Sequence, residues 1–228
     1  MIVSSPAVVL KRFSYRESSM IARCFTREMG KLGIIVHGAH RKKGSTAAYF
    51  QPLNYLDLVF YFKQTRELQT VSKVAFQKPW QLLTTDLKKI AYGFAIVDLI
   101  DRCLSFQDAH PDLFDELVWI LETLEKREDH LNLLFWYFQY RLLTLLGFKP
   151  DFSHSELEYT PLPNPYSSPN SRLIFELFEQ GKSGLDQDIT ITAADRKLVS
   201  DYLYTHLKIH FEGLHKLESL RVLRELLV

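Results

Sequence analysis

The hydrophobic pattern of this chain changes its period near Pro79, and this change constrains the fold more than any other feature. Before Pro79 apolar residues alternate with polar ones. One face, as in a half-buried strand, is formed by period-2 spacing of Leu56, Leu58, Phe60 and Phe62. After Pro79 they recur every three or four positions, which is typical of amphipathic helices. The sequence therefore predicts a β-rich part followed by a helical part.

The first 78 residues are predicted to form a small barrel. Five β-rich segments are expected, at residues 6–13, 19–27, 31–39, 53–63 and 68–76. One long connection, residues 40–52, separates the third segment from the fourth. Five short strands with a single long link suit a closed barrel, and the OB-fold is such a barrel.

Residues 79–228 are predicted to form an all-helical domain, which makes the fold a two-domain α+β chain. Helices are expected at residues 83–100, 113–124, 131–146, 171–180, 192–211 and from 214 onward. Thr192 and Asp195 have the pattern of a capping box that opens the helix at 192–211. The first of these carries one apolar stripe of Leu83, Leu87, Ile90, Phe94, Val97 and Ile100. The helix at 131–146 is apolar on nearly every side, so we expect it to be central and buried. A proline-rich segment, residues 149–170, is expected to be irregular.

Charge is divided unevenly between the two parts. Residues 1–75 hold twelve Lys and Arg against four Asp and Glu, a net charge of +8. The remainder holds sixteen against twenty-three, a net charge of −7, so the whole chain carries only +1. This asymmetry predicts two parts with different partners, and it favours a phosphate-bearing partner for the barrel.

Candidate DNA-binding residues lie on the predicted barrel and in its long connection. The basic candidates are Lys11, Arg12, Arg16, Arg27, Lys31, Arg41, Lys42 and Lys43. Three aromatic residues beside them, Phe13, Tyr15 and Tyr49, are candidates for stacking on bases. The alternatives are that the charges are an ordinary solvated surface and that the aromatic residues fill the core.

Residue types that support catalysis or metal binding in other proteins do not form complete motifs in this chain. Gly181-Lys182-Ser183 resembles the end of a phosphate-binding loop, but Glu176 stands where the motif needs a glycine. His206 and His210 have the spacing of a metal pair without further ligands. We therefore expect no catalytic site, no cofactor and no metal. Two distant cysteines, no leader-like N-terminus and no long apolar run predict a reduced, cytoplasmic protein.

Several short motifs resemble those of the RecO family of bacterial recombination mediators. They are Val8-Val9-Leu10-Lys11-Arg12, Glu17-Ser18, Phe25-Thr26-Arg27-Glu28-Met29-Gly30-Lys31, Gly38-Ala39-His40-Arg41-Lys42-Lys43-Gly44-Ser45 and Gln51-Pro52. Weaker similarity continues through Leu145-Leu146-Gly147-Phe148-Lys149-Pro150 to Leu217-Glu218-Ser219-Leu220. The chain departs from the family at His40, where the family has arginine. It also lacks the four-cysteine zinc module of many members, because residues 151–192 contain no cysteine.

The resemblance implies a non-enzymatic protein of DNA repair that binds single- and double-stranded DNA and anneals complementary strands. It implies work with RecR, and loading of RecA onto strands coated by the single-stranded DNA-binding protein. The acidic tail of that protein is expected to dock on the helical domain, where Trp136 and Arg141 are the candidate contacts. The alternative is that the aromatic run at residues 135–138 is sealed core and that Arg141 only extends to solvent. Two alternatives from the residues alone are an RNA- or ribosome-binding barrel and a protein-interaction scaffold.

Overall fold

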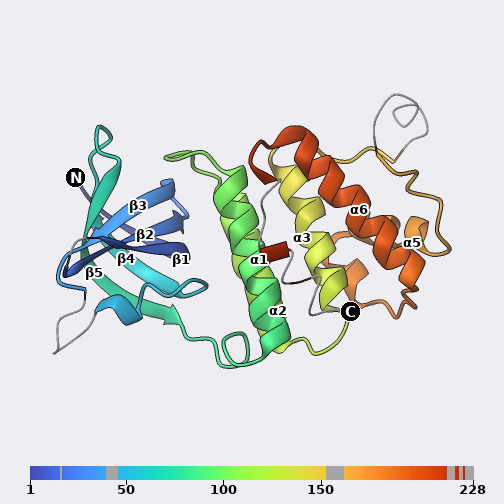
Figure 1. Ribbon diagram of the computed structural model, residues 1–228, viewed down its shortest axis with the longest axis horizontal. Coiled ribbons are helices and arrows are strands. Elements are labelled where there is room, and N and C mark those ends of the chain that lie inside the picture. Colours follow the sequence, from blue (N-terminus) through green and yellow to red (C-terminus); the bar gives the residue numbers. More distant parts are fainter. Residues whose placement is uncertain (16, 40–45, 153–161, 215–218, 221–222, 224–228) are drawn as a thin grey trace. The chain divides into compact units, whose positions relative to one another are not determined.

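The computed structural model describes residues 1–15, 17–39, 46–152, 162–214, 219–220 and 223. The chain divides into two compact units, and Figure 1 labels the helices and strands that they contain. The first unit comprises residues 1–126 together with the described residues beyond 216, and the second comprises residues 127–216. These units do not coincide with the division at residue 78 that the sequence suggests, and that division stays a prediction about the chain's domains.

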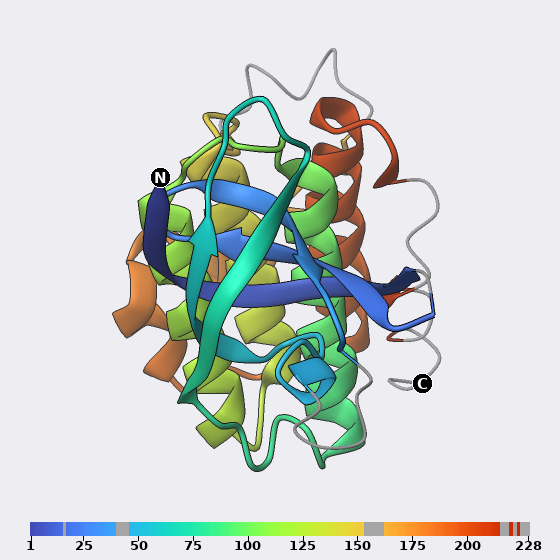
Figure 2. The same cartoon turned by 90° about the vertical axis from the view of Figure 1, so that its left-hand side faces the viewer.

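Five strands in the first unit close into a barrel, which confirms the predicted fold. They are β1 (Ile2–Tyr15), β2 (Ser19–Thr26), β3 (Gly30–Val36), β4 (Tyr55–Tyr61) and β5 (Leu68–Lys78). Their order around the barrel is β1-β2-β3-β5-β4, with β3 and β5 parallel and every other pair antiparallel. Figure 2 looks onto these strands and shows how they cross. A closed five-stranded barrel of this kind has the architecture of an OB-fold.

Alternate residues of each strand fill the barrel. On β2, Met20 and Cys24 are buried inside it, whereas Ile21 and Arg23 lie between the core positions and point outward. The predicted inward face of β4 is also correct, since Leu56, Leu58 and Phe60 are buried in the same cluster. Phe62 only packs partly against that cluster, because β4 ends at Tyr61.

The first unit also contains the α-helices α1 (Leu87–Cys103) and α2 (Pro111–Lys126). The apolar stripe predicted for α1 is divided by the structure: Val97 and Ile100 are buried, whereas Leu87 is 63% and Phe94 41% exposed. The buried face instead carries Ala91, Tyr92, Ala95, Ile96, Val97, Leu99 and Ile100. Apolar residues lie on more than one side of this helix, and the partners against which it packs decide which side is covered.

The described part of the second unit includes the α-helices α3 (Leu131–Leu145), α5 (Ser171–Glu179) and α6 (Ala193–His210). As predicted, α3 is buried over most of its surface. The capping box is also confirmed, because the Asp195 amide donates to Thr192 Oγ1 at 3.2 Å and the Thr192 amide donates to the Asp195 carboxylate at 2.9 Å. Of the final predicted helix, Ser219, Leu220 and Leu223 are described and helical, while the rest lies outside the described residues.

Two short 3-10 helices, η1 (Thr46–Ala48) and η2 (Gly181–Asp186), were not predicted. Gly181 and Lys182 lie in η2, which follows a helix rather than the strand that a phosphate-binding loop requires. The described proline-rich residues 162–170 form neither a helix nor a strand, as expected. Within the described ranges, no helix is both long and apolar enough to cross a membrane.

Candidate nucleic-acid interface

A row of outward-facing residues crosses the barrel from β1 to β5. The strand register pairs Phe13 on β1 with Ile21 on β2, Arg23 with Gly33 on β3, and Gly33 with Leu68 on β5. Because neighbouring strands lie about 4.8 Å apart, these partners form one continuous outer surface. This is the β2–β3 face, on which OB-folds bind oligonucleotides.

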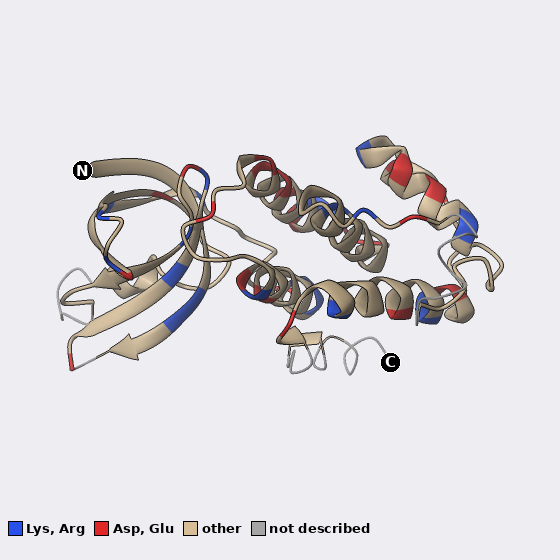
Figure 3. Cartoon of the chain, turned by 90° about the horizontal axis from the view of Figure 1, so that it is seen from above, with Lys and Arg blue, Asp and Glu red and all other residues tan. Residues whose placement is uncertain are grey.

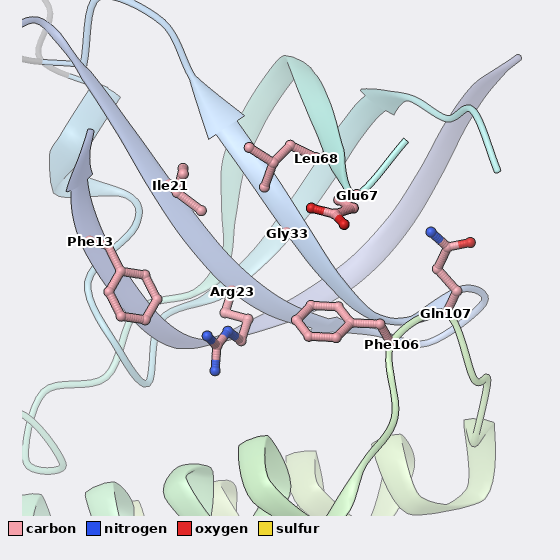
Figure 4. A pocket seen from close by; sticks show the side chains of 8 residues that line it. All are labelled: Phe13, Ile21, Arg23, Gly33, Glu67, Leu68, Phe106 and Gln107. Carbon is pink, nitrogen blue, oxygen red and sulfur yellow. The ribbon is translucent and has the colours of Figure 1, made fainter. Parts of the chain in front are cut away.

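The row forms the floor of an open groove with a volume of about 580 Å³. Its lining residues are Phe13, Ile21, Arg23, Gly33, Glu67, Leu68, Phe106 and Gln107 (Figure 4), and we call it the β2–β3 groove. Gly33 has a structural reason to be a glycine, since a Cβ there would lie 2.7 Å from Leu68 Cδ2 and 3.2 Å from the Glu67 carbonyl oxygen.

The segment after α1 supplies one wall of the β2–β3 groove. The Gln107 amide donates to the Lys31 carbonyl at 2.9 Å, and Phe106 forms an isolated parallel bridge with Lys31. The Gln107 side chain also donates to the Arg66 carbonyl at 3.3 Å. These bonds attach the segment both to the edge of β3 and to the β4–β5 connection, so Phe106 is held beside the barrel strands.

Three planar side chains, those of Phe13, Arg23 and Phe106, lie one after another along the β2–β3 groove (Figure 4). The Arg23 guanidinium carbon is 5.1 Å from the ring centroid of Phe13 and 5.7 Å from that of Phe106. Both distances are within the range of cation–π contacts. Arg23 Nη1 donates to the buried Asp101 carboxylate at 2.7 Å, which fixes the guanidinium. Phe13 remains 37% and Phe106 52% exposed.

The structure places the predicted basic residues in different surroundings. Lys11 and Arg12 are exposed on β1, with Lys11 Nζ 5.8 Å from the Phe13 ring centroid. Four other candidates, Arg16, Arg41, Lys42 and Lys43, lie outside the described residues.

Two of the predicted phosphate contacts form ion pairs within the first unit, and their contact with DNA stays a prediction. Lys31 is 5% exposed, its Nζ donates to the Asp101 carbonyl, and burial lowers the pKa of its ammonium group. Arg27 donates through Nε and Nη2 to both carboxylate oxygens of Asp115, at 2.8 Å each. This hydrogen-bonded charge raises the pKa of Arg27. The helices thus supply acidic partners that a strand pattern does not reveal.

Of the three aromatic candidates, Phe13 lines the β2–β3 groove. Tyr15 is half-buried near the end of β1. Tyr49 packs partly on the barrel core and on Phe76, with ring centroids 4.7 Å apart. Only Phe13 is therefore placed with the groove residues.

Other exposed cations were missed by the sequence prediction. Lys63 and Arg66 lie in the exposed connection between β4 and β5, and Figure 3 shows Lys and Arg on the strands and connections of the barrel. The connection between the fourth and fifth strands is one of the two loops with which OB-folds bind oligonucleotides. The predicted OB-fold therefore already indicated Lys63 and Arg66 as candidates. Phe106 had no such signal, because it follows α1.

Two family models and several known proteins match this chain. The model of the recombination protein O N-terminal part matches residues 1–80, and that of its C-terminal part matches residues 84–186. A DNA repair protein RecO from Chlorobium phaeobacteroides is 30% identical over 91% of this chain and 79% of its own length. The chain belongs to the RecO family.

Further RecO relatives agree with this assignment. The DNA repair protein RecO of Salinibacter ruber is 37% identical over 69% of this chain, although the match spans only 60% of that protein. That of Chloroherpeton thalassium is 32% identical over 79% of this chain and 70% of its own length.

The partner-binding candidates of this RecO family member lie on α3 in the second unit. Trp136 is 3% exposed, and its indole nitrogen donates to Ser200 Oγ at 2.9 Å. It is a core residue, and its contact with a partner stays a prediction. Arg141 is half-buried, and Phe135, Tyr137 and Phe138 beside Trp136 are buried as well. The alternative interpretation of the aromatic run as sealed core is the one that the structure supports.

The histidine pair of the second unit belongs to an aromatic stack. The rings of His206 and His210 are 5.0 Å apart, and His210 stacks on Phe148 at 4.2 Å. Within the described part of the chain, His, Cys, Asp and Glu form no group of three or more that is placed to hold a metal ion.

His206 is expected to make the second unit sensitive to acid. Burial, with a smaller contribution from His210, lowers its pKa from 6.5 to about 4. The unfolded chain therefore binds a proton more readily, so stability falls as the pH drops from about 6.5 toward 4. The loss contributed by His206 between pH 7 and pH 5 should be about 2 kcal/mol. Urea denaturation at both pH values should show a smaller loss for His206→Leu, and an equal loss in both proteins would contradict this account.

Proposed function

We propose that this chain is a non-enzymatic DNA-binding protein of DNA repair, and that its barrel is the DNA-binding element. The observation that carries the proposal is the β2–β3 groove on the binding face of an OB-type barrel, with exposed cations beside it. Lys11 and Arg12 lie on β1, while Lys63 and Arg66 lie between β4 and β5. The RecO relatives are named DNA repair proteins, and this supports the same function.

The charge of the barrel explains how it would bind and anneal strands. Cations that contact DNA release the counterions condensed on its phosphates, and this release favours binding to any sequence. Two complementary strands repel each other through their phosphates, so a basic surface that screens this repulsion promotes annealing. Residues 1–75 carry the necessary excess, a net charge of +8.

Within repair, the proposed activities are binding of single- and double-stranded DNA, strand annealing, and help in placing RecA on single strands. The proposed partners are RecR and the tail of the single-stranded DNA-binding protein, in a cytoplasmic, nucleoid-associated setting. A strand-annealing assay with and without the single-stranded DNA-binding protein tests this directly. Loss of annealing activity when that protein coats the strands would contradict the mediator role.

The basic connection between β3 and β4 is expected to contribute strongly to DNA affinity. Replacing Arg41, Lys42 and Lys43 together by alanine should make the negative slope of log affinity against log salt concentration less steep by roughly 2 to 3 units, if each contacts a phosphate. The slope is measured by fluorescence anisotropy with a labelled oligonucleotide. The matched control replaces three cations of the second unit, Arg172, Lys197 and Lys208, and should leave the slope nearly unchanged. An unaltered slope in the loop variant would remove the connection from the interface.

The alternative partners require separate measurements, since a basic barrel does not by its charge distinguish DNA from RNA. Competition between labelled DNA and a structured RNA of equal length tests the RNA-binding alternative, which predicts that RNA displaces DNA efficiently. A scaffold that binds only acidic proteins would instead show no steep salt dependence with DNA.

A further inference from the structure

We propose that the β2–β3 groove is a stacking site for an unpaired base of single-stranded DNA. The barrel would then recognise bases as well as phosphates. This inference rests on the proposed DNA-binding function and adds to it the part of the nucleotide that the groove accepts. The proposal is based on three planar side chains that line the groove, those of Phe13, Arg23 and Phe106. Ile21 and Leu68 line the groove beside them.

The exposed surfaces of the groove match a nucleobase. A base offers a flat, apolar face, and proteins bind such faces on aromatic rings and on the planar guanidinium of arginine. Phe13 and Phe106 keep 37% and 52% of their surfaces exposed, although large aromatic residues are normally covered. The volume of about 580 Å³ lies within the range of ligand-binding clefts.

The electrostatics of the groove favour a base over a phosphate. The charge of Arg23 is paired with the Asp101 carboxylate, whose side chain is only 5% exposed. Glu67 adds a second carboxylate to the lining and is itself exposed. A phosphate entering here would meet this negative charge, whereas the amino groups of a base can donate hydrogen bonds to a carboxylate.

Cations on two sides of the groove are placed to bind the phosphates that flank such a base. Lys11 lies 5.8 Å from the Phe13 ring centroid at one wall. At the other wall, the Gln107 side chain donates to the carbonyl of Arg66, whose own side chain is exposed. A single strand could therefore place a base in the groove while its backbone contacts cations at both walls.

The site is organised before any ligand binds. Asp101 fixes the guanidinium of Arg23, and the bridge to Lys31 fixes the position of Phe106. A preorganised site loses less side-chain freedom on binding, which favours affinity. In duplex DNA the base faces are covered by their neighbours, so only an unpaired base can occupy the groove without the cost of unstacking.

The test compares a single-stranded oligonucleotide with an abasic oligonucleotide of the same length, which keeps the phosphates and lacks the bases. The full chain should bind the strand with bases more tightly, and Phe106→Ala and Phe13→Ala should each weaken that binding by roughly 5- to 150-fold. Neither variant should change binding to the abasic strand by more than about twofold, because phosphate contacts supply that affinity. Phe106→Tyr keeps the ring and should bind like the unaltered chain.

Phe94→Ala is the matched control, since Phe94 is 41% exposed in the same unit and does not line the groove. Thermal denaturation of each variant checks that the fold is kept. Equal affinity of the unaltered chain for both strands, or no effect of the Phe13 and Phe106 variants, overturns the stacking site while DNA binding stands. Failure of the unaltered chain to bind either strand or a duplex would instead overturn the proposed function itself.

Discussion

Replacing Asp101 with leucine is expected to destabilise the first unit by about 3 to 5 kcal/mol. The side chains of Asp101 and Lys31 are 5% and 6% exposed, and Lys31 Nζ lies 3.7 Å from Asp101 Oδ1. Removing the carboxylate leaves the Lys31 ammonium buried without a counter-ion, and such a charge is costly. Arg23 loses the same partner, but 32% of its side chain is exposed, so water stabilises it in part.

A double variant separates the cost of an unpaired charge from the cost of lost packing. Asp101→Leu combined with Lys31→Met replaces both members of the pair with apolar groups of similar size. We expect this chain to recover most of the stability, because a buried ion pair is often no more stabilising than well-packed apolar residues. Urea denaturation gives the free energies of unfolding. A double variant as unstable as Asp101→Leu would show that the loss comes from packing.

Replacing Gly30 with alanine is expected to destabilise the first unit by about 2 to 4 kcal/mol. Gly30 has a φ of +69°, which an alanine adopts only with strain. Its added Cβ would also lie 2.0 Å from the carbonyl oxygen of Asp108, so the backbone of one segment must move. Asp108 follows the two residues that line the groove, and the displacement should also weaken binding to single-stranded DNA.

Gly147→Ala is the control for the conformational part of this effect. Gly147 has a φ of +87°, and no atom lies within 4 Å of the position that an added Cβ would take, so only the strain applies. That strain should amount to about 1 kcal/mol. Thermal denaturation of both variants in the full chain gives the comparison. If the two substitutions cost the same, the close approach of Asp108 to Gly30 is not a determinant of stability.

Local patterns were sufficient to locate most elements of this protein. Alternation of apolar residues predicted β4 and its inward face of Leu56, Leu58 and Phe60, because strand geometry sends successive side chains to opposite sides. Thr192 and Asp195 predicted the start of α6, because a capping box involves only residues within one turn. The resemblance of short motifs to the RecO family was confirmed by matches that extend over both parts of the chain.

Predictions about exposure were less successful, because exposure depends on partners distant in the sequence. The sequence did not distinguish the exposed residues of the α1 stripe from its buried ones, or the buried Lys31 from the exposed cations. It also did not show that the aromatic run around Trp136 is buried. Asp115 and Asp101, which bind Arg27 and Lys31, lie on helices that follow the barrel in the chain. A charge count therefore did not reveal that Lys31 forms a buried ion pair with Asp101 and that Arg27 forms an exposed one with Asp115.

The amino-acid sequence alone determined the barrel, the helices, the family and the basic excess of the first 75 residues, since each follows from local spacing, composition or motifs. The tertiary structure alone decided which of those cations stay at the surface and which aromatic residues form a site. Phe106 joins Phe13 and Arg23 only because hydrogen bonding to Lys31 attaches the segment after α1 to the edge of β3. That contact closes a long loop of the chain, and no short-range pattern encodes it.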